Sequence, residues 1–280
     1  MGGAGVSANS RMARYHATEE PEMQETQSVS PYQRRPALAR WLAVLVLLLT
    51  LTVGLRMTIF NATYTAGVVS RSTTGEKVIN QLNDELQSYG ISGSPITTSL
   101  AQPYLAMGVA QLYGQTPTTS VDDTDLSSAV SSQAVTMGTT ASNRVISRIA
   151  KQAGKLAKTA FGTPAMKQAA IKIQFAQKVN LWVMIATLLL LVVTFFYALS
   201  VHHVFASLGP GLTLGGLLTT IAGAVSYVGL PLVVTSSSQT VAALLTTIGH
   251  NGLAVIIFMG IAEIIVGLVV LLGHRTFRNA

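Results

Sequence analysis

The sequence contains no cysteine and very few charged residues. Among its 280 residues, Asp, Glu, Lys and Arg together make up 10% and aromatic residues 6%. Without cysteine the chain has no disulfide, no thiolate nucleophile and no cysteine metal ligand, so any part outside a membrane is held together by packing alone. An average soluble domain carries about 25% charged residues. The shortage of charge therefore excludes an ordinary soluble protein.

Sequence motifs with a known catalytic or ligand-binding chemistry are also missing. The chain has no HExxH, no GxSxG and no phosphate-binding glycine loop. Three aspartates cluster within residues 122–125, but Gln133 stands where an EF-hand would need its bidentate glutamate. The neighbouring His202 and His203 have no third ligand close in the sequence. We therefore expect no catalytic residue, no metal site and no cofactor.

What the chain does contain is four long apolar stretches, over residues 37–60, 181–199, 212–234 and 253–273. Each is about long enough to cross a bilayer as a helix. Residues 61–180 are polar, rich in Ser and Thr, and helical rather than alternating in their periodicity. The sequence predicts an all-α integral membrane protein with four transmembrane helices and a small helical extracytoplasmic domain between the first and second.

Capping and turn signals divide residues 61–180 into several helices. Thr73 and Glu76 form a capping box, and Gly90 can end the helix that they begin. Further helices are predicted over residues 96–113 and 126–161. Thr163 followed by Pro164 is typical of a new helix start, and this last helix is expected to continue into the second span.

The remaining segments have simpler patterns. Residues 1–36 show no apolar period and are expected to form a disordered cytoplasmic tail. Residues 274–280 are expected to form a cytoplasmic tail at the other end. The first span reads as an uncleaved signal anchor rather than a cleaved signal peptide, because its leader is long and its cleavage site weak. Residues 238–249 carry one apolar stripe but are too short to cross, which predicts an interfacial helix.

The arginines that flank the first and last spans predict that both termini are cytoplasmic. Three lysines within residues 167–178 would then lie outside, but charges in so long a loop have little influence on orientation. The expected location is the cell membrane of a bacterium, with residues 61–180 outside the cytoplasm. The flanking arginines are Arg34, Arg35, Arg40, Arg275 and Arg278.

Glu263 lies at the middle of the fourth span, where an ionised carboxylate costs several kcal/mol unless it is paired, hydrated or protonated. Gly260 and Gly267 share its helical face, so the side chain should point into the bundle. Either Glu263 is a proton or cation site, or it is a neutral glutamic acid that fixes helix packing. Its candidate polar partners are Arg56, Thr187, Thr194, Ser226 and Tyr227.

Two further patterns indicate contact surfaces. Gly211 and Gly215 form a GxxxG step, which predicts close helix packing in the third span. Five basic residues recur at spacings of three and four and so share one helical face. This face would contact anionic lipid headgroups or wall polymers, or it is simply solvated. Nucleic acid is not expected, since no aromatic residues interleave the charges. The five residues are Arg144, Arg148, Lys151, Lys155 and Lys158.

These observations favour a non-enzymatic multi-pass membrane protein that presents a small extracytoplasmic helical domain for binding, sensing or envelope assembly. The alternative is a small transporter or ion-channel subunit that uses Glu263. The expected partners are the lipid bilayer, anionic headgroups or wall polymers, and another protein or a second copy of the chain in the membrane.

Overall fold

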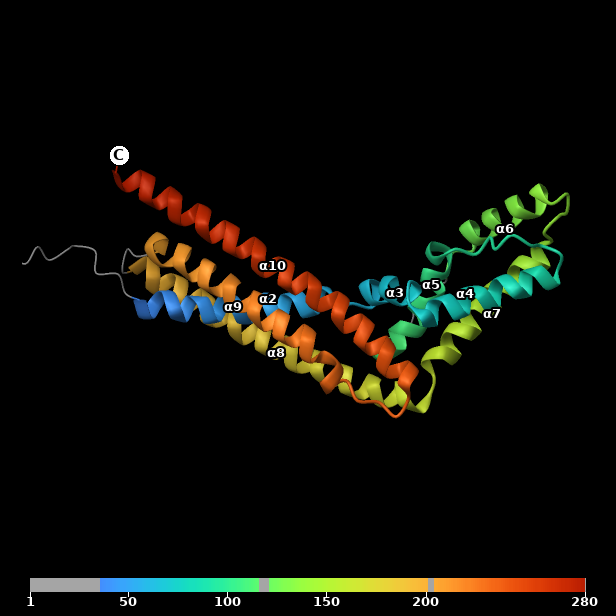
Figure 1. Ribbon diagram of the computed structural model, residues 1–280, viewed down its shortest axis with the longest axis horizontal. Coiled ribbons are helices and arrows are strands. Elements are labelled where there is room, and N and C mark those ends of the chain that lie inside the picture. The colour runs from blue at the N-terminus through green and yellow to red at the C-terminus, as the bar shows by residue number, and fades with distance from the viewer. Residues whose placement is uncertain (1–35, 116–120, 201–203, 280) are drawn as a thin grey trace, which may run out of the picture. The chain divides into compact units, whose positions relative to one another are not determined.

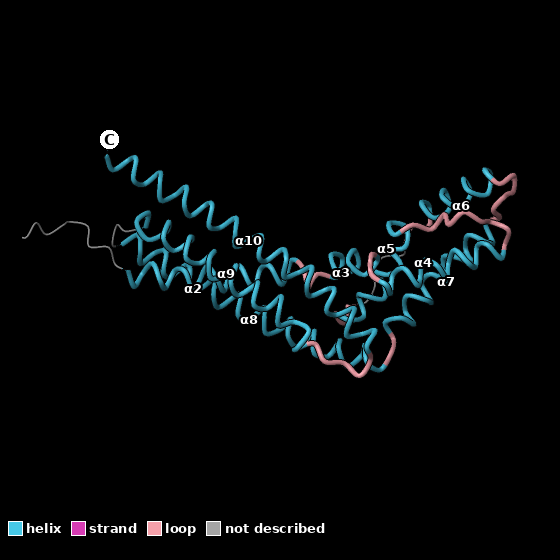
Figure 2. Tube along the Cα trace, viewed as in Figure 1, coloured by secondary structure: helices cyan, strands magenta, loops and turns pink. Residues whose placement is uncertain are grey.

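The computed structural model describes residues 36–115, 121–200 and 204–279. All the regular structure within these residues is α-helical, as Figures 1 and 2 show, so the expectation of an all-α chain is confirmed for them. The helices are α2 (Pro36–Met57), α3 (Ala62–Ser70), α4 (Thr73–Ser88), α5 (Thr98–Leu112), α6 (Thr124–Thr136), α7 (Asn143–Phe161), α8 (Pro164–Ser200), α9 (Val204–Val233) and α10 (Gln239–Asn279).

Some sequence-based expectations fall outside these ranges. The tail predicted over residues 1–36 lies outside the described residues apart from Pro36, and so do Arg34 and Arg35. His202 and His203 also lie outside them, as do the side chains of the two arginines in the C-terminal tail.

Within the described residues, four helices are long and apolar enough to cross a membrane, which confirms four candidate spans. Such a set fits a multi-pass membrane protein. The segments are Ala37–Met57 in α2, Pro164–Ser200 in α8, Ser207–Val233 in α9 and Gln239–Gly273 in α10.

Helix α9 packs against both α10 and α2, and glycines allow it to come close to each. A Cβ atom on Gly216 would lie 2.6 Å from the carbonyl oxygen of Gly260 on α10. One on Gly215 would lie 2.7 Å from Cγ1 of Val46 on α2, and Gly211 faces α2 one turn away. Gly267 faces Thr213 of α9 in the same tight way. A Cβ atom at Gly216 or Gly267 would meet the backbone across the α9–α10 crossing, so these two backbones are in direct contact. At the α9–α2 crossing, Gly211 and Gly215 leave room for side chains of α2.

Helix α8 joins the other spans through α2, by packing and by two polar contacts. The side-chain amide of Asn180 donates to the carbonyl oxygen of Thr52 over 2.9 Å. The indole N–H of Trp41 donates to the hydroxyl of Thr194 over 3.3 Å. Most other side chains on the apolar part of α8 are exposed. In a bilayer this exposed face would contact lipid or another protein.

Helices α3 to α7 form a helical domain, with a core drawn from all of them. Local signals explain its elements: the hydroxyl of Ser72 caps α4 by accepting from the N–H of Gly75, one position before the predicted Thr73. Gly90 follows α4 with a φ of 82°, which favours glycine. The largest fully buried side chains of this core are Val69, Leu82, Leu86, Leu105, Val109, Leu112, Val130 and Ile149.

The single helix predicted over residues 126–161 is wrong, because the structure has two helices there. Helix α6 ends at Thr136, and Gly138 follows with a φ of 70°, a conformation that stops a helix. Helix α7 then begins after Ser142, whose hydroxyl accepts from the N–H of Val145. The reversal places α6 against α7.

The separate helix predicted over residues 238–249 is also corrected. The structure has one continuous helix, α10, from Gln239 through the last span. The apolar stripe of its first turns, Val241, Leu244 and Ile248, is buried in the core of the helical domain. Protein packing, which the pattern alone cannot distinguish from lipid contact, therefore covers this stripe. Helix α8 likewise runs unbroken from Pro164, as the capping signal predicted.

Candidate functional sites

Glu263 lies where α2, α9 and α10 meet. Its Oε1 atom is hydrogen bonded to the hydroxyl of Thr50 on α2. On the α9 side, a Cβ atom on Gly216 would lie 2.9 Å from the Cβ atom of Glu263, so only glycine leaves room for this side chain. The carboxyl group thus points into the bundle, as its neighbouring glycines predict.

Two polar atoms at or near this junction are buried without a hydrogen-bond partner among the described residues. They are Oε2 of Glu263 and the hydroxyl of Thr219, which lies one turn after Gly215 on the α9 face that meets α2. The hydroxyl of Thr50 is also 3.0 Å from the carbonyl oxygen of Val46. It has a single proton to donate. If the carboxyl group of Glu263 is protonated, it can donate to the hydroxyl of Thr50, and this hydroxyl can donate its own proton to the carbonyl oxygen of Val46.

The other predicted partners of Glu263 lie elsewhere. Arg56 is exposed near the end of α2. Thr187 and Thr194 donate to carbonyl oxygens of their own helix, over 2.8 Å and 2.7 Å. Tyr227 stacks on His250 with ring centroids 4.2 Å apart. Ser226 is exposed on α9. The structure brings none of the five predicted partners to the carboxyl group.

Sequence reasoning missed Thr50, the residue that does contact Glu263. Thr50 and Thr52 are the polar side chains within the apolar run of α2. They lie two positions apart and so face different sides of the helix. The hydroxyl of Thr50 contacts Glu263 on α10, and the backbone carbonyl of Thr52 accepts from Asn180 on α8. The signal in the sequence that could have identified Thr50 is a hydroxyl in the middle of the first span, where Arg56 is the only predicted partner.

The five basic residues of α7 lie on one exposed face, while the opposite face enters the core. Arg148 covers the ring of Tyr89 at 6.0 Å from its centroid and donates to its hydroxyl over 3.0 Å. Arg144 is exposed. The three lysines, Lys151, Lys155 and Lys158, instead line a pocket. The basic face is therefore not uniform.

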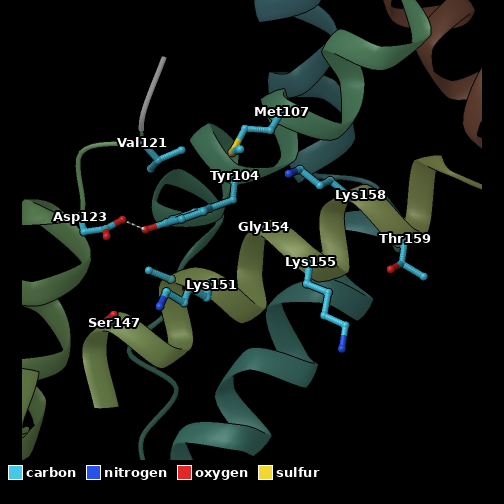
Figure 3. A pocket seen from close by; sticks show the side chains of 11 residues that line it. Tyr104, Met107, Val121, Asp123, Ser147, Lys151, Gly154, Lys155, Lys158 and Thr159 are labelled. Atoms are coloured by element: carbon cyan, nitrogen blue, oxygen red, sulfur yellow. Dashed lines mark hydrogen bonds between the residues drawn. The ribbon is translucent and has the colours of Figure 1, made fainter. Parts of the chain in front are cut away.

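This pocket lies between α5 and α7 and has a volume of about 660 Å³ (Figure 3). Tyr104 and Met107 line it from α5. The hydroxyl of Tyr104 donates to Oδ1 of Asp123 over 2.6 Å. Burial, and then the hydrogen bond to Asp123, raise the pKa of Tyr104 above its ordinary value. Tyr104 is therefore a neutral donor at physiological pH, which leaves the charge of the pocket to its lysines and Asp123.

The neighbouring Asp122 is hydrogen bonded to Thr124, the first residue of α6. Asp122 accepts hydrogen bonds from the hydroxyl and the backbone N–H of Thr124, over 2.5 Å and 3.0 Å. These bonds hold the pKa of Asp122 below its ordinary value. Within the described ranges, no three His, Asp or Glu side chains are grouped so that they could hold a metal ion.

A second cavity, of about 480 Å³, lies where α4, α8 and α10 begin. Hydroxyl groups line it, but no charged residue does. One of the hydroxyls, that of Thr74, is buried without a hydrogen-bond partner among the described residues. The concentration of charge thus distinguishes the pocket between α5 and α7 from this cavity.

The chain matches no protein-family model, no curated protein and no solved structure.

Proposed function

We propose that the protein is a non-enzymatic, multi-pass protein of the bacterial cell membrane that presents its helical domain outside the cytoplasm for binding, sensing or envelope assembly. One observation carries the proposal: α8 and α10 each run without a break from the core of the helical domain into a candidate span. A domain joined in this way is held in a fixed position above the membrane.

The contacts at the two junctions support this reading. The first turns of α8 bury Met166 and Ala169 in the domain core. Further along α8, the amide of Gln174 donates to the carbonyl oxygen of Leu112 over 3.3 Å. Where α3 meets α10, the hydroxyl of Tyr64 donates to the carbonyl oxygen of Asn251 over 3.1 Å. These bonds favour a domain that moves together with its spans.

A retained first span agrees with the packing of α2. This helix supplies Thr50 to Glu263 and covers Gly211 and Gly215 of α9. Cleavage after the first span would remove that partner and leave both glycines uncovered. This packing supports an uncleaved anchor. The arginines that flank the first and last spans favour a cytoplasmic N-terminus, and four crossings would return the C-terminus to the same side.

Labelling of single cysteines in intact cells tests the orientation, since the natural chain has none. Ser132 is exposed on α6. Ser132→Cys should react with a membrane-impermeant maleimide in intact cells, whereas the matched variant Ser7→Cys in the N-terminal tail should react only after lysis. The reverse pattern would overturn the proposed orientation.

The alternative, a small transporter or channel subunit, is favoured by a different observation. Among the described residues, one oxygen of the Glu263 carboxyl group and the hydroxyl of Thr219 are buried without a hydrogen-bond partner. Ionisable groups inside a bundle often belong to ion pathways. Proteoliposomes that contain the parent or Glu263→Gln would show a flux that depends on this carboxyl group if the alternative holds.

A further inference from the structure

The pocket between α5 and α7 carries an excess of positive charge. Three lysines line it against a single acidic residue, Asp123, whose carboxylate already accepts the hydroxyl of Tyr104. None of the three lysines forms an ion pair with another described residue. The sequence also has no acidic residue from 144 to 178. Two positive charges therefore remain uncompensated at the opening of a single pocket.

The shape of the pocket also fits a ligand rather than a flat surface. Gly154 lies between the lysines on α7, and a Cβ atom there would meet nothing within 4 Å (Figure 3). The opposite wall offers the ring of Tyr104 and the side chain of Met107, and the hydroxyls of Ser147 and Thr159 line the α7 wall. The space beside Gly154 is thus bordered by cations, hydroxyls and an apolar wall.

The spacing of the lysines indicates how many anionic groups the ligand carries. Lys151 and Lys158 are seven residues apart, which places their backbones about 10 Å apart along α7. In Figure 3 the side chains of the three lysines point in different directions, so separate phosphate groups would reach their ammonium groups. Lysine ammonium groups are compact donors that commonly bind phosphate. We propose that this pocket binds a soluble ligand that carries two or more phosphate groups, an inference that rests on the proposed role of the domain as a binding module.

Lipid headgroups carry the same chemistry, but the geometry favours a soluble source. Helix α8 starts at Pro164, beyond the end of α7, and its charged residues continue to Lys178. These residues cover about 20 Å of helix before the span can begin. Attraction between exposed charges is screened over about 8 Å at physiological ionic strength. The three pocket lysines of α7 therefore lie too far from the membrane in which the chain is embedded for its headgroups to attract them.

Calorimetric titration with inorganic tripolyphosphate, using the full chain in nanodiscs of neutral lipid, tests the charge requirement. Lys151→Gln, Lys155→Gln and Lys158→Gln combined should weaken binding at least tenfold. The control combines Lys77→Gln, Lys167→Gln and Lys172→Gln, which remove the same charge from exposed positions outside the pocket. It should change the affinity less than twofold. An equal loss in both variants would show that only net charge matters and would overturn the proposal.

Gly154→Leu tests the shape requirement, because it fills the pocket and keeps every lysine. Leucine is also a better helix former than glycine, so the variant should fold, and its thermal unfolding checks this. Binding of tripolyphosphate should weaken at least tenfold. Unchanged affinity in the folded variant would contradict a pocket.

Binding of anionic vesicles distinguishes a lipid headgroup from a soluble ligand as the source of the phosphate groups. Any binding of phosphatidylglycerol vesicles to the protein in nanodiscs should be the same with and without the three lysines. Lysine-dependent binding of these vesicles, without binding of tripolyphosphate, would overturn the assignment of a soluble ligand. The labelling of Ser132→Cys needs no ligand, so a failure of this inference is distinguishable from a failure of the proposed function.

Discussion

Substitution of Glu263 tests whether the carboxyl group acts as a neutral link between spans. Glutamine has nearly the same size and can both donate and accept, so Glu263→Gln can keep the bond to Thr50. We expect it to change the free energy of unfolding by less than about 1 kcal/mol, because a hydrogen bond between membrane helices contributes on average only about 0.6 kcal/mol. Glu263→Ala loses the bond and leaves a cavity, at a cost of about 2–4 kcal/mol.

The assay is equilibrium unfolding in mixed micelles, followed by the fluorescence of Trp41 and Trp182, the two tryptophans of the chain. Trp41 contacts Thr194 of α8, so its emission reports the separation of α2 from α8. A double-mutant cycle of Glu263→Gln with Thr50→Val isolates the energy of the bond. A loss for Glu263→Gln as large as for Glu263→Ala would refute a neutral carboxyl group, because glutamine replaces the protonated form and not the ionised one.

Three further predictions concern packing and pH. Gly216→Leu should destabilise the spans by about 3 kcal/mol, because its Cβ atom would meet the α10 backbone. A Cβ atom at Gly229 on the same helix would meet nothing within 4 Å, so the control Gly229→Leu should cost little. Unfolding in mixed micelles compares the two variants. Leu244→Ala should cost about 2–5 kcal/mol, since Leu244 is 3% exposed in the domain core, and the exposed Ala243→Ser is its control in thermal unfolding. Burial raises the pKa of Tyr113 to about 12. The protonated form is thus favoured by folding, and about 2–3 kcal/mol of stability should be lost as pH rises from 10 to 12; a Tyr113→Phe variant with the same loss over this range would contradict the assignment.

The spans and helix starts could be predicted from the sequence because their signals are local. Long apolar runs give the four candidate spans, and Thr163 with Pro164 gives the start of α8. The division between α6 and α7 was missed although Gly138 was visible, because an isolated glycine is tolerated within many helices. Only the packing of α6 against α7 decides that the chain reverses there.

The candidate sites depended on contacts that no local pattern contains. An apolar stripe at Val241, Leu244 and Ile248 has the same spacing whether lipid or protein covers it. The basic spacing of α7 predicted the shared face, but the pocket also needs Tyr104 and Met107 from α5. Such a pairing of helices depends on the tertiary structure, so the sequence predicted the charges and not the space between them.

Ion flux in proteoliposomes tests the central claim most directly, because it separates a presenting protein from a transporter. The measurement follows proton and Na⁺ or K⁺ movement into vesicles that contain the parent, Glu263→Gln, or no protein. If the chain anchors and presents its helical domain, the parent should show no flux above that of protein-free vesicles. A reproducible flux in the parent that disappears in folded Glu263→Gln would contradict the account and establish the transporter.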